Sequence, residues 1–536
     1  MTADPLMPSE RAVHHWTTTN LGEAVPGVMT PLTWALWGAP GERASRRAAH
    51  EIGVLRADEL ELPADPADWI LRVFHGRLAM QLEFMALVGD RMPGTSGRDA
   101  IRSMFGDTPP GMTFAPTRAR YPAVAWRLPR TFLRFPALLR DVADDQDRWW
   151  RASVAQARGL DLDGARRLFA EAARRFERAG HVQLLGTMSS VRPLYDALEA
   201  VVARAGTGDV GVLSGTGGAE MAVVSDIWRA SRGQLTVEDV VVRHGFHGPN
   251  EGEVSSTVWR EDDRPLRAMV AGYARRPDGD SPLLRLAGED AALARMQAAV
   301  VAALPRTRRP AARLVLRLAA ERIPLRGVAK RSFLQAVDAG RAAARRAGEL
   351  LAADGVLDVP GDVFLLTGDE LLGALSPEVR EVVAWRRERR AAHQAVRLAT
   401  AEWAGLPELL AAGDGPAGEP AQLVTGTGVS AGVVEGVVRV VTDPTFEDVE
   451  PDEILVATTT DPSWSSIMFL SSALVVDVGG ALSHAAVVAR ELQVPCVVNT
   501  RDGTRLLRTG DRVRVDGTAG TVEVLERAPQ ALAAAD

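Results

Sequence analysis

The segment Val478–Val498, VGGALSHAAVVARELQVPCVV, decides how the C-terminal part of the chain is interpreted. Two glycines form a flexible approach, Ser483 is a suitable N-cap, and His484 opens a helix predicted over His484–Leu492. A strand is predicted to follow at Cys496–Val498. A histidine at this place lies beside free backbone N–H groups and the positive end of the helix dipole, a natural site for an anion. A phosphoryl group on the ring would be stabilised there, and the neutral, nucleophilic imidazole would be favoured.

Short β-branched runs separated by turns surround this segment and predict a compact α/β module. One further helix is predicted at Ser463–Ser471. The predicted strands are Gly432–Val441, Ile454–Ala457, Leu474–Val476, Cys496–Val498, Arg512–Val515 and Thr521–Leu525.

The preceding region, from about residue 40 to about residue 405, is predicted to be mainly helical, because Ala, Leu, Arg and Glu recur at three- and four-residue spacing. Clear helices are Ser332–Leu351 and Asp163–Arg178, the latter with Asp163 as N-cap and Gly180 as its stop. The Gly-, Pro- and Ala-rich stretch 405–423 is predicted to be a linker. We therefore predict an α+β multidomain protein, with a large mainly helical domain at 1–404 and a small α/β domain at 424–536.

Composition excludes several classes of protein. The 536 residues carry a net charge of −7, which argues against a protein that binds nucleic acid or anionic membranes. The single cysteine, Cys496, excludes an internal disulfide and a thiolate zinc site. Neither a signal-type start nor a long apolar run is visible, so a cytoplasmic location is expected. The chain also contains a single lysine, Lys330, among many arginines.

The histidine segment closely resembles the phosphohistidine signature of the PEP-utilising enzyme family, which includes pyruvate phosphate dikinase, phosphoenolpyruvate synthase and rifampicin phosphotransferase. Thr460–Trp464 resembles the TDPxW stretch of that family, and 510–517 resembles its closing hairpin. The resemblance implies that 424–536 is a swivelling domain that carries a phosphoryl group on His484. It also implies a phosphate-binding role for Gly479, Gly480 and Ser483.

The helical region resembles the substrate-binding middle domain of rifampicin phosphotransferase. The resemblance rests on segments that occur in the order of that family: Trp16–Leu32, His244–Glu253, Trp259–Glu261, Leu325–Lys330 and Gly361–Thr367.

Relatives of full length begin with an ATP-grasp module, whereas this sequence starts with the substrate-type domain and shows no G-x-x-x-x-G-K-[ST] loop. We therefore expect a split enzyme, in which ATP and Mg²⁺ act only through a separate ATP-grasp-type partner and no cofactor binds this chain alone. Phenylphosphate synthase resembles this arrangement, since its histidine-bearing and ATP-binding parts are separate chains. No metal ligand is assigned to the chain.

Phosphoryl transfer needs cationic side chains around the moving group. Arg326 and Lys330, at i and i+4 on one helix face, match the arginine–lysine pair that the resemblance implies, and both are predicted to be catalytic. Arg322 and Arg341 are weaker candidates for substrate binding.

A second cluster of candidates lies in the Gly/Pro-rich segment HGFHGPNEGE, which begins at His244. His247 and Glu251 are predicted to help deprotonate a hydroxyl substrate, and His244 and Glu253 to bind that substrate. Two alternatives stay open: a Mg²⁺ or Zn²⁺ cluster, and a purely structural loop.

These features predict a phosphotransferase that moves a phosphoryl group from His484 to a hydroxyl of a small apolar substrate. A phosphorylation-driven dehydratase or cyclase is an alternative, because both reactions share the first step. A binding protein or enzyme that reuses the fold without phosphoryl chemistry is the third possibility.

Overall fold

A computed structural model describes residues 4–7, 14–19, 21–105, 108–208, 210–214, 218–411, 422–441, 450, 452–460, 464–480 and 483–528. Contacts divide the chain into two compact units. Unit 1 comprises Met1–Gly215, Asn250–Ser256 and Gln297–Gly413, and unit 2 comprises Thr216–Pro249, Thr257–Met296 and Asp414–Asp536. Residues 216–249 and 257–296, which the sequence interpretation assigned to the helical domain, thus group by contacts with the C-terminal residues.

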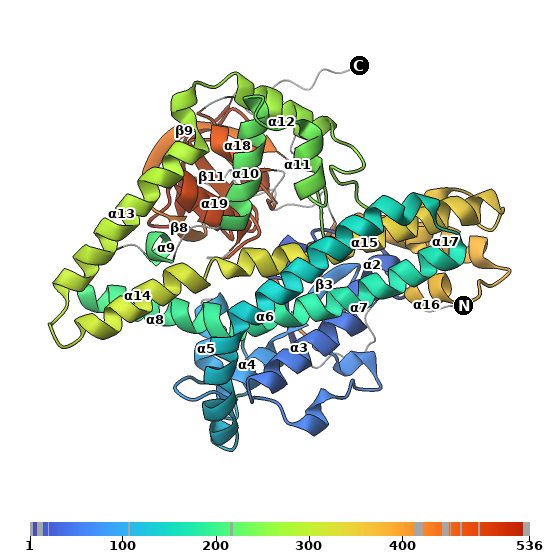
Figure 1. The fold of residues 1–536 in the computed structure, drawn as a ribbon, viewed down its shortest axis with the longest axis horizontal. Coiled ribbons are helices and arrows are strands. Elements are labelled where there is room, and N and C mark those ends of the chain that lie inside the picture. The colour runs from blue at the N-terminus through green and yellow to red at the C-terminus, as the bar shows by residue number, and fades with distance from the viewer. Residues whose placement is uncertain are drawn as a thin grey trace. The chain divides into compact units, whose positions relative to one another are not determined.

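Unit 1 is built on long helices that pack along one another. Figure 1 shows α6 (Tyr121–Gln156), α7 (Leu162–Gly186) and α15 (Leu325–Ala353) side by side, and α3 (Ala39–Glu51) packs on α7. Small residues permit α15 to approach α7 closely: a Cβ on buried Gly340 would lie 3.5 Å from the Cβ of Ala172 on α7.

Shorter elements complete unit 1. A four-stranded antiparallel sheet has the order β2-β3-β1-β5, and β4 pairs with β6. The strands are β1 (His15–Thr17), β2 (Leu71–Phe74), β3 (Arg77–Gln81), β4 (Val396–Leu398), β5 (Glu402–Ala404) and β6 (Leu409–Ala411). The remaining helices are α1 (Leu21–Ala24), α2 (Pro31–Trp37), α4 (Leu82–Arg91), α5 (Gly97–Phe105), α8 (Arg192–Ala205), α9 (Val210–Leu213), α14 (Arg309–Arg322), α16 (Gly368–Leu372) and α17 (Val379–Gln394).

Unit 2 contains an eight-stranded sheet of order β7-β14-β13-β9-β10-β11-β12-β8, in which β9 to β12 are parallel. The strands are β7 (Leu423–Thr425), β8 (Thr427–Ser430), β9 (Val433–Val441), β10 (Ile454–Ala457), β11 (Ala473–Val476), β12 (Cys496–Val498), β13 (Arg512–Asp516) and β14 (Thr521–Glu526). The helices are α10 (Gly218–Ser231), α11 (Val237–His244), α12 (Arg264–Ala274), α18 (Ser465–Leu470), α19 (His484–Leu492) and α20 (Gly503–Leu506), while α13 (Pro282–Ala303) runs from unit 2 into unit 1.

Both faces of the parallel strands are buried, as their continuous apolar sequences require. Leu455 and Leu474 point into a core shared with α10, α12 and α19, while Ile454 and Val475 point into the opposite core. The period-two alternation of side chains therefore fixes the register of these strands.

The predicted fold class is confirmed: a mainly helical region precedes a C-terminal α/β region. The strands Ile454–Ala457 and Cys496–Val498 and the helix His484–Leu492 have their predicted bounds. The helices predicted at Asp163–Arg178 and Ser332–Leu351 have other bounds, since α15 begins earlier, at Leu325, and both ends of α7 differ. The α7 helix is capped by Asp161, whose side chain accepts from the Gly164 amide, and it continues past Gly180 to Gly186, because a helical glycine can be tolerated where the helix is buried by its neighbours.

The predicted linker 405–423 includes β6 and the start of β7, and its residues 412–421 lie outside the described residues. Among the helices that the structure describes, none is long and apolar enough to cross a membrane.

Candidate functional site

His484 begins α19, as its sequence context predicts. The Ser483 side chain accepts a hydrogen bond from the Ala486 amide at 3.1 Å, which fixes the first turn as an N-cap. The Ser483 amide donates to the Gly480 carbonyl at 3.0 Å, which closes the glycine approach into a turn. His484 is only 5% exposed, and the apolar face of α19 that follows it is buried in the core of unit 2. The imidazole is therefore held at the positive end of a well-anchored helix.

Thr460 provides a hydrogen-bond partner for the imidazole. Its Oγ1 lies 3.3 Å from Nδ1 of His484, and the Thr460 side chain is also buried. The two residues follow β10 and β11, which are adjacent parallel strands, so their carboxyl ends meet at one edge of the sheet. When the hydroxyl accepts from Nδ1–H, the lone pair of the ring is on Nε2, which is then the ring nitrogen that could act as a nucleophile.

Asp477, which the sequence interpretation missed, stabilises the same edge of the sheet through hydrogen bonds. It follows β11 directly and accepts from the Thr500 hydroxyl at 2.8 Å and from the amide and hydroxyl of Thr504. Burial raises the pKa of the Asp477 carboxyl. A Cβ on Gly503 would lie 2.8 Å from Asp477 Oδ1, so a glycine is needed beside this carboxylate. The ends of β11 and β12 are thereby tied together just before the histidine loop.

Of the predicted TDPxW stretch, Thr460 and Trp464 are placed, and Trp464 is buried in the core that surrounds α19. Asp461, Pro462 and Ser463 lie outside the described residues, as do residues 481 and 482 of the histidine loop.

In unit 1, the predicted pair Arg326 and Lys330 lies in the first turns of α15, with Pro324 at its N-cap. The Lys330 ammonium lies 3.2 Å from Oε1 of Glu251, whose side chain is 4% exposed against 28% for Lys330. The structure therefore brings two predicted catalytic residues, one from the helix and one from the loop, into an ion pair.

Three other candidates of unit 1 are engaged by the protein itself. The Glu253 carboxylate accepts from the Thr30 amide and hydroxyl at 3.1 and 2.7 Å. Arg341 is fully buried and donates to Asp338 and to loop carbonyl groups. Arg322 donates to the Phe132 carbonyl at 3.2 Å. These contacts favour structural roles for the three side chains over the predicted contact with a substrate.

His244 and His247 lie in unit 2 and are both buried. Nε2 of His244 lies 3.1 Å from the Asp226 carboxylate, which also accepts a hydrogen bond from the Arg243 guanidinium at 3.0 Å. The hydrogen bond with His244 is the largest cause that lowers the pKa of the Asp226 carboxyl. His247 packs between the rings of Phe246 and Trp259, with centroids 4.2 and 5.7 Å away. Asp226 is a second residue that the sequence interpretation missed.

The His244–Glu253 segment is thus divided between the units, since residues 250–256 belong to unit 1 and both histidines to unit 2. Gly252 is required in the unit 1 part: a Cβ there would lie 1.9 Å from the Ala24 carbonyl oxygen. Within the described ranges, no three His, Cys, Asp or Glu side chains are grouped so that they could hold a metal ion.

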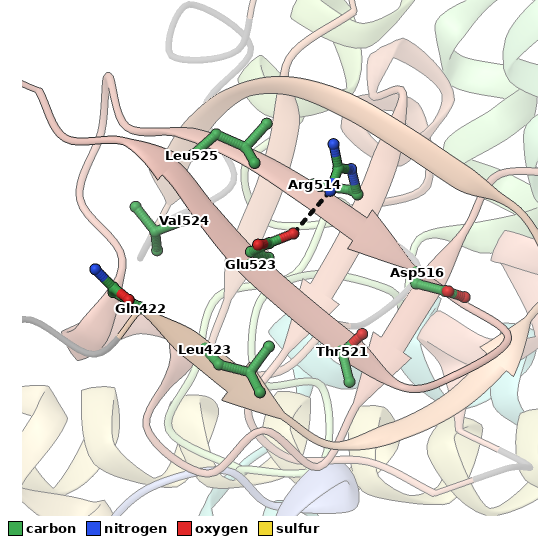
Figure 2. A pocket seen from close by; sticks show the side chains of 8 residues that line it. All are labelled: Gln422, Leu423, Arg514, Asp516, Thr521, Glu523, Val524 and Leu525. Atoms are coloured by element: carbon green, nitrogen blue, oxygen red, sulfur yellow. Dashed lines mark hydrogen bonds and ion pairs between the residues drawn. The ribbon is translucent and has the colours of Figure 1, made fainter.

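A cavity of about 600 Å³ lies on the sheet of unit 2, over β7, β13 and β14. Figure 2 shows the ion pair between Arg514 and Glu523 in its wall, at 2.8 Å. The predicted site residues are not among its lining residues, which are Gln422, Leu423, Arg514, Asp516, Thr521, Glu523, Val524 and Leu525.

Comparison with known proteins identifies two regions. Residues 449–520 match the mobile domain of PEP-utilising enzymes, and residues 236–327 match the fourth domain of rifampicin phosphotransferase. The first region contains His484 and Thr460, and the second contains the two histidines, Glu251 and Arg326.

Several proteins align with parts of the chain. An uncharacterized protein of Mycobacterium tuberculosis is 38% identical over 295 residues, which are 53% of this chain and 31% of that protein. A rifampicin phosphotransferase of Streptomyces sviceus is 39% identical over 182 residues, 33% of this chain and 20% of that enzyme. That of Bacillus cereus is 43% identical over 106 residues, 20% of this chain and 12% of that enzyme.

The chain therefore spans less than a third of the length of these relatives. The two matched regions occur here in one chain, and the first of them carries the histidine whose surroundings are described above. On these grounds the chain is similar, over these two regions, to the mobile domain of PEP-utilising enzymes and to the fourth domain of rifampicin phosphotransferase.

Proposed function

We propose that this protein is a histidine-dependent phosphotransferase, in which His484 receives a phosphoryl group and passes it to a hydroxyl of a small, apolar organic substrate. The observation that carries the proposal is the buried imidazole at the start of α19, with Nδ1 at 3.3 Å from the Thr460 hydroxyl. The donor half of the reaction, with ATP and Mg²⁺, is assigned to a separate ATP-grasp-type partner.

In the first step, Nε2 of His484 attacks the phosphorus of the donor. The N–P bond forms as the P–O bond to the leaving group breaks, and the leaving oxygen keeps the electron pair. The Nδ1–H group then donates to Thr460 Oγ1 and stays protonated. The phosphoryl oxygens meet the N-terminal amide groups of α19, which supply partial positive charge.

In the second step, the substrate oxygen attacks the same phosphorus and the N–P bond breaks, which returns the electron pair to Nε2. Arg326 and Lys330 would neutralise the charge of the moving group. The hydroxyl proton passes to a base, for which Glu251, His247 and His244 are the candidates. Relatives that are named rifampicin phosphotransferases support this class of reaction.

Chemical phosphorylation tests the first step without the partner. Potassium phosphoramidate, a small phosphoryl donor for imidazole, should add one acid-labile, base-stable phosphoryl group to the intact chain, located at His484 by peptide mapping. The variant His484→Gln should not be labelled. His181→Gln is a matched control, because His181 is buried and bonds Glu51 at 3.0 Å in a structural contact. Labelling that persists in His484→Gln, or that the native chain never shows, would refute the proposal.

The second test concerns the partner. ATP with Mg²⁺ alone should leave His484 unlabelled, and addition of a purified ATP-grasp protein encoded near this chain should produce the label. If ATP with Mg²⁺ alone labels His484, the assignment of the donor half to another chain is wrong, although the histidine chemistry stands.

A further inference from the structure

Three basic residues of one helix hold one short loop. On α15, Lys330, Arg341 and Arg345 follow one another at intervals of eleven and four residues, which places them on the same helix face. All three contact the segment 251–256: Lys330 at the Glu251 carboxylate, Arg341 at two carbonyl oxygens, and Arg345 at the carbonyl oxygens of residues 255 and 256. The loop is therefore built onto α15 rather than left to move by itself.

Arg341 is the most constrained of the three. Its side chain has no exposed surface, Nη2 donates to the carbonyls of Glu251 and Glu253 at 2.9 and 3.0 Å, and Nη1 donates to Asp338 at 3.0 Å. Asp338 is itself fixed by Trp150, whose indole N–H donates to it at 2.8 Å. A buried charge held by several hydrogen bonds has few other positions to take, so it can define where the loop backbone lies.

The two residues that follow Glu251 in the chain are held in place as well. The carbonyl of Gly252 accepts from the indole N–H of Trp37 at 3.1 Å, and the carboxylate of Glu253 is held by Thr30. Eleven residues of helix separate Lys330 from Arg341, which is about 16 Å at the usual rise. The Glu251 side chain therefore extends from a backbone that Arg341 anchors toward the first turns of α15, where Lys330 lies.

We propose that Arg341 is a positioning residue: through the backbone of 251–253 it presents the Glu251 carboxylate to Lys330, and it thereby keeps the lysine protonated and directed. The acceptor-side group is then the Lys330–Glu251 pair rather than the lysine alone. Its use in phosphoryl transfer rests on the proposed function, whereas the positioning itself can be tested without any transfer.

The composition of the chain makes this test specific. Lys330 is the single lysine, so an amine reagent such as trinitrobenzenesulfonate has one side-chain target, which peptide mapping separates from the α-amino group. Only the unprotonated amine reacts, and a carboxylate neighbour favours the protonated form. At fixed pH, Glu251→Gln should therefore raise the labelling rate of Lys330 about tenfold. This factor corresponds to a pKa change of about one unit, the lower end of the range that a close opposite charge produces.

Arg341→Met combined with Asp338→Asn removes both buried charges together, so that no buried carboxylate is left without its arginine. If Arg341 positions Glu251, this variant should label as fast as Glu251→Gln, and adding Glu251→Gln to it should give no further increase. The milder Arg341→Gln should show an intermediate rate. Arg345→Met is the matched control, because Arg345 holds the same loop one turn later and should leave the rate at Lys330 unchanged.

Native helix content and a cooperative unfolding transition well above the assay temperature select the variants that are compared, and Arg341→Gln supplies the result if the double variant does not fold. A folded Arg341 variant that labels at the native rate, while Glu251→Gln labels faster, would overturn the proposal. A native rate in Glu251→Gln itself would overturn it too. Neither result depends on His484, so a failure here is distinct from a failure of phosphoramidate labelling.

Discussion

Replacement of Thr460 by valine tests the geometry around the nucleophile. The change keeps the branched shape of the side chain and removes the hydroxyl that lies 3.3 Å from Nδ1 of His484. Because both residues are buried, water cannot easily replace the lost contact. A hydrogen bond of this kind contributes about 1.4 kcal/mol, so the rate at which phosphoramidate labels His484 should fall about tenfold.

The assay is the initial rate of acid-labile incorporation, measured by intact mass over time. Thr460→Ser keeps the hydroxyl and should stay close to the native rate. Thr458→Val makes the same chemical change at an exposed position just after β10 and serves as the matched control. Native-like labelling of Thr460→Val would show that the Thr460 hydroxyl does not orient the imidazole, and the assignment of Nε2 as nucleophile would lose its basis.

Three further outcomes follow from contacts described above. Ser483→Ala removes the N-cap of α19 and should lower the free energy of unfolding of unit 2 by about 1 kcal/mol in a denaturant titration. Gly252→Ala forces a Cβ against the Ala24 carbonyl and should cost about 1–3 kcal/mol, whereas Gly361→Ala, with open space around its Cβ, should cost much less; equal thermal midpoints for the two would contradict the contact. The His244 hydrogen bond lowers the pKa of Asp226 below its ordinary value of 3.8, so this carboxylate stabilises the fold above that value and the stability is lost as pH falls through the folded pKa. Asp226→Asn should flatten the acid limb of a stability-against-pH curve, and an unchanged limb would contradict it.

Local patterns were sufficient where secondary structure depends on neighbours in sequence. The short continuous apolar run Ile454–Ala457 and the serine cap before His484 each predict their element, and the structure confirms both. Pairing across long separations leaves no such local signal. His15–Thr17 pairs with Glu402–Ala404, and neither three-residue segment carries enough pattern to indicate a strand.

The same reason explains which site residues sequence reasoning missed. Asp477 gains its role from Thr500 and Thr504, and Asp226 gains its role from His244, so each depends on a partner that the fold supplies. In the sequence alone, a carboxylate with such a partner in the fold looks the same as a carboxylate without one. The positions of Asp477 after a buried strand and of Asp226 within an apolar helix were the signals that could have drawn attention to them.

The use of arginine and lysine on α15 follows from the shapes of the groups that they bind. Arg341 meets two carbonyl oxygens and a carboxylate at once, and the planar guanidinium fork provides donors in several fixed directions for that purpose. Lys330 meets one carboxylate oxygen of Glu251, for which a compact ammonium on a flexible stem is sufficient. An ammonium also differs from a guanidinium in that its protonation responds to its surroundings, because arginine stays charged in proteins. If the proposed function holds, the single lysine placed against a buried glutamate is therefore the position on this helix where a change in the loop can alter the charge that meets the phosphoryl group, and Arg341 is one of the residues that hold this loop.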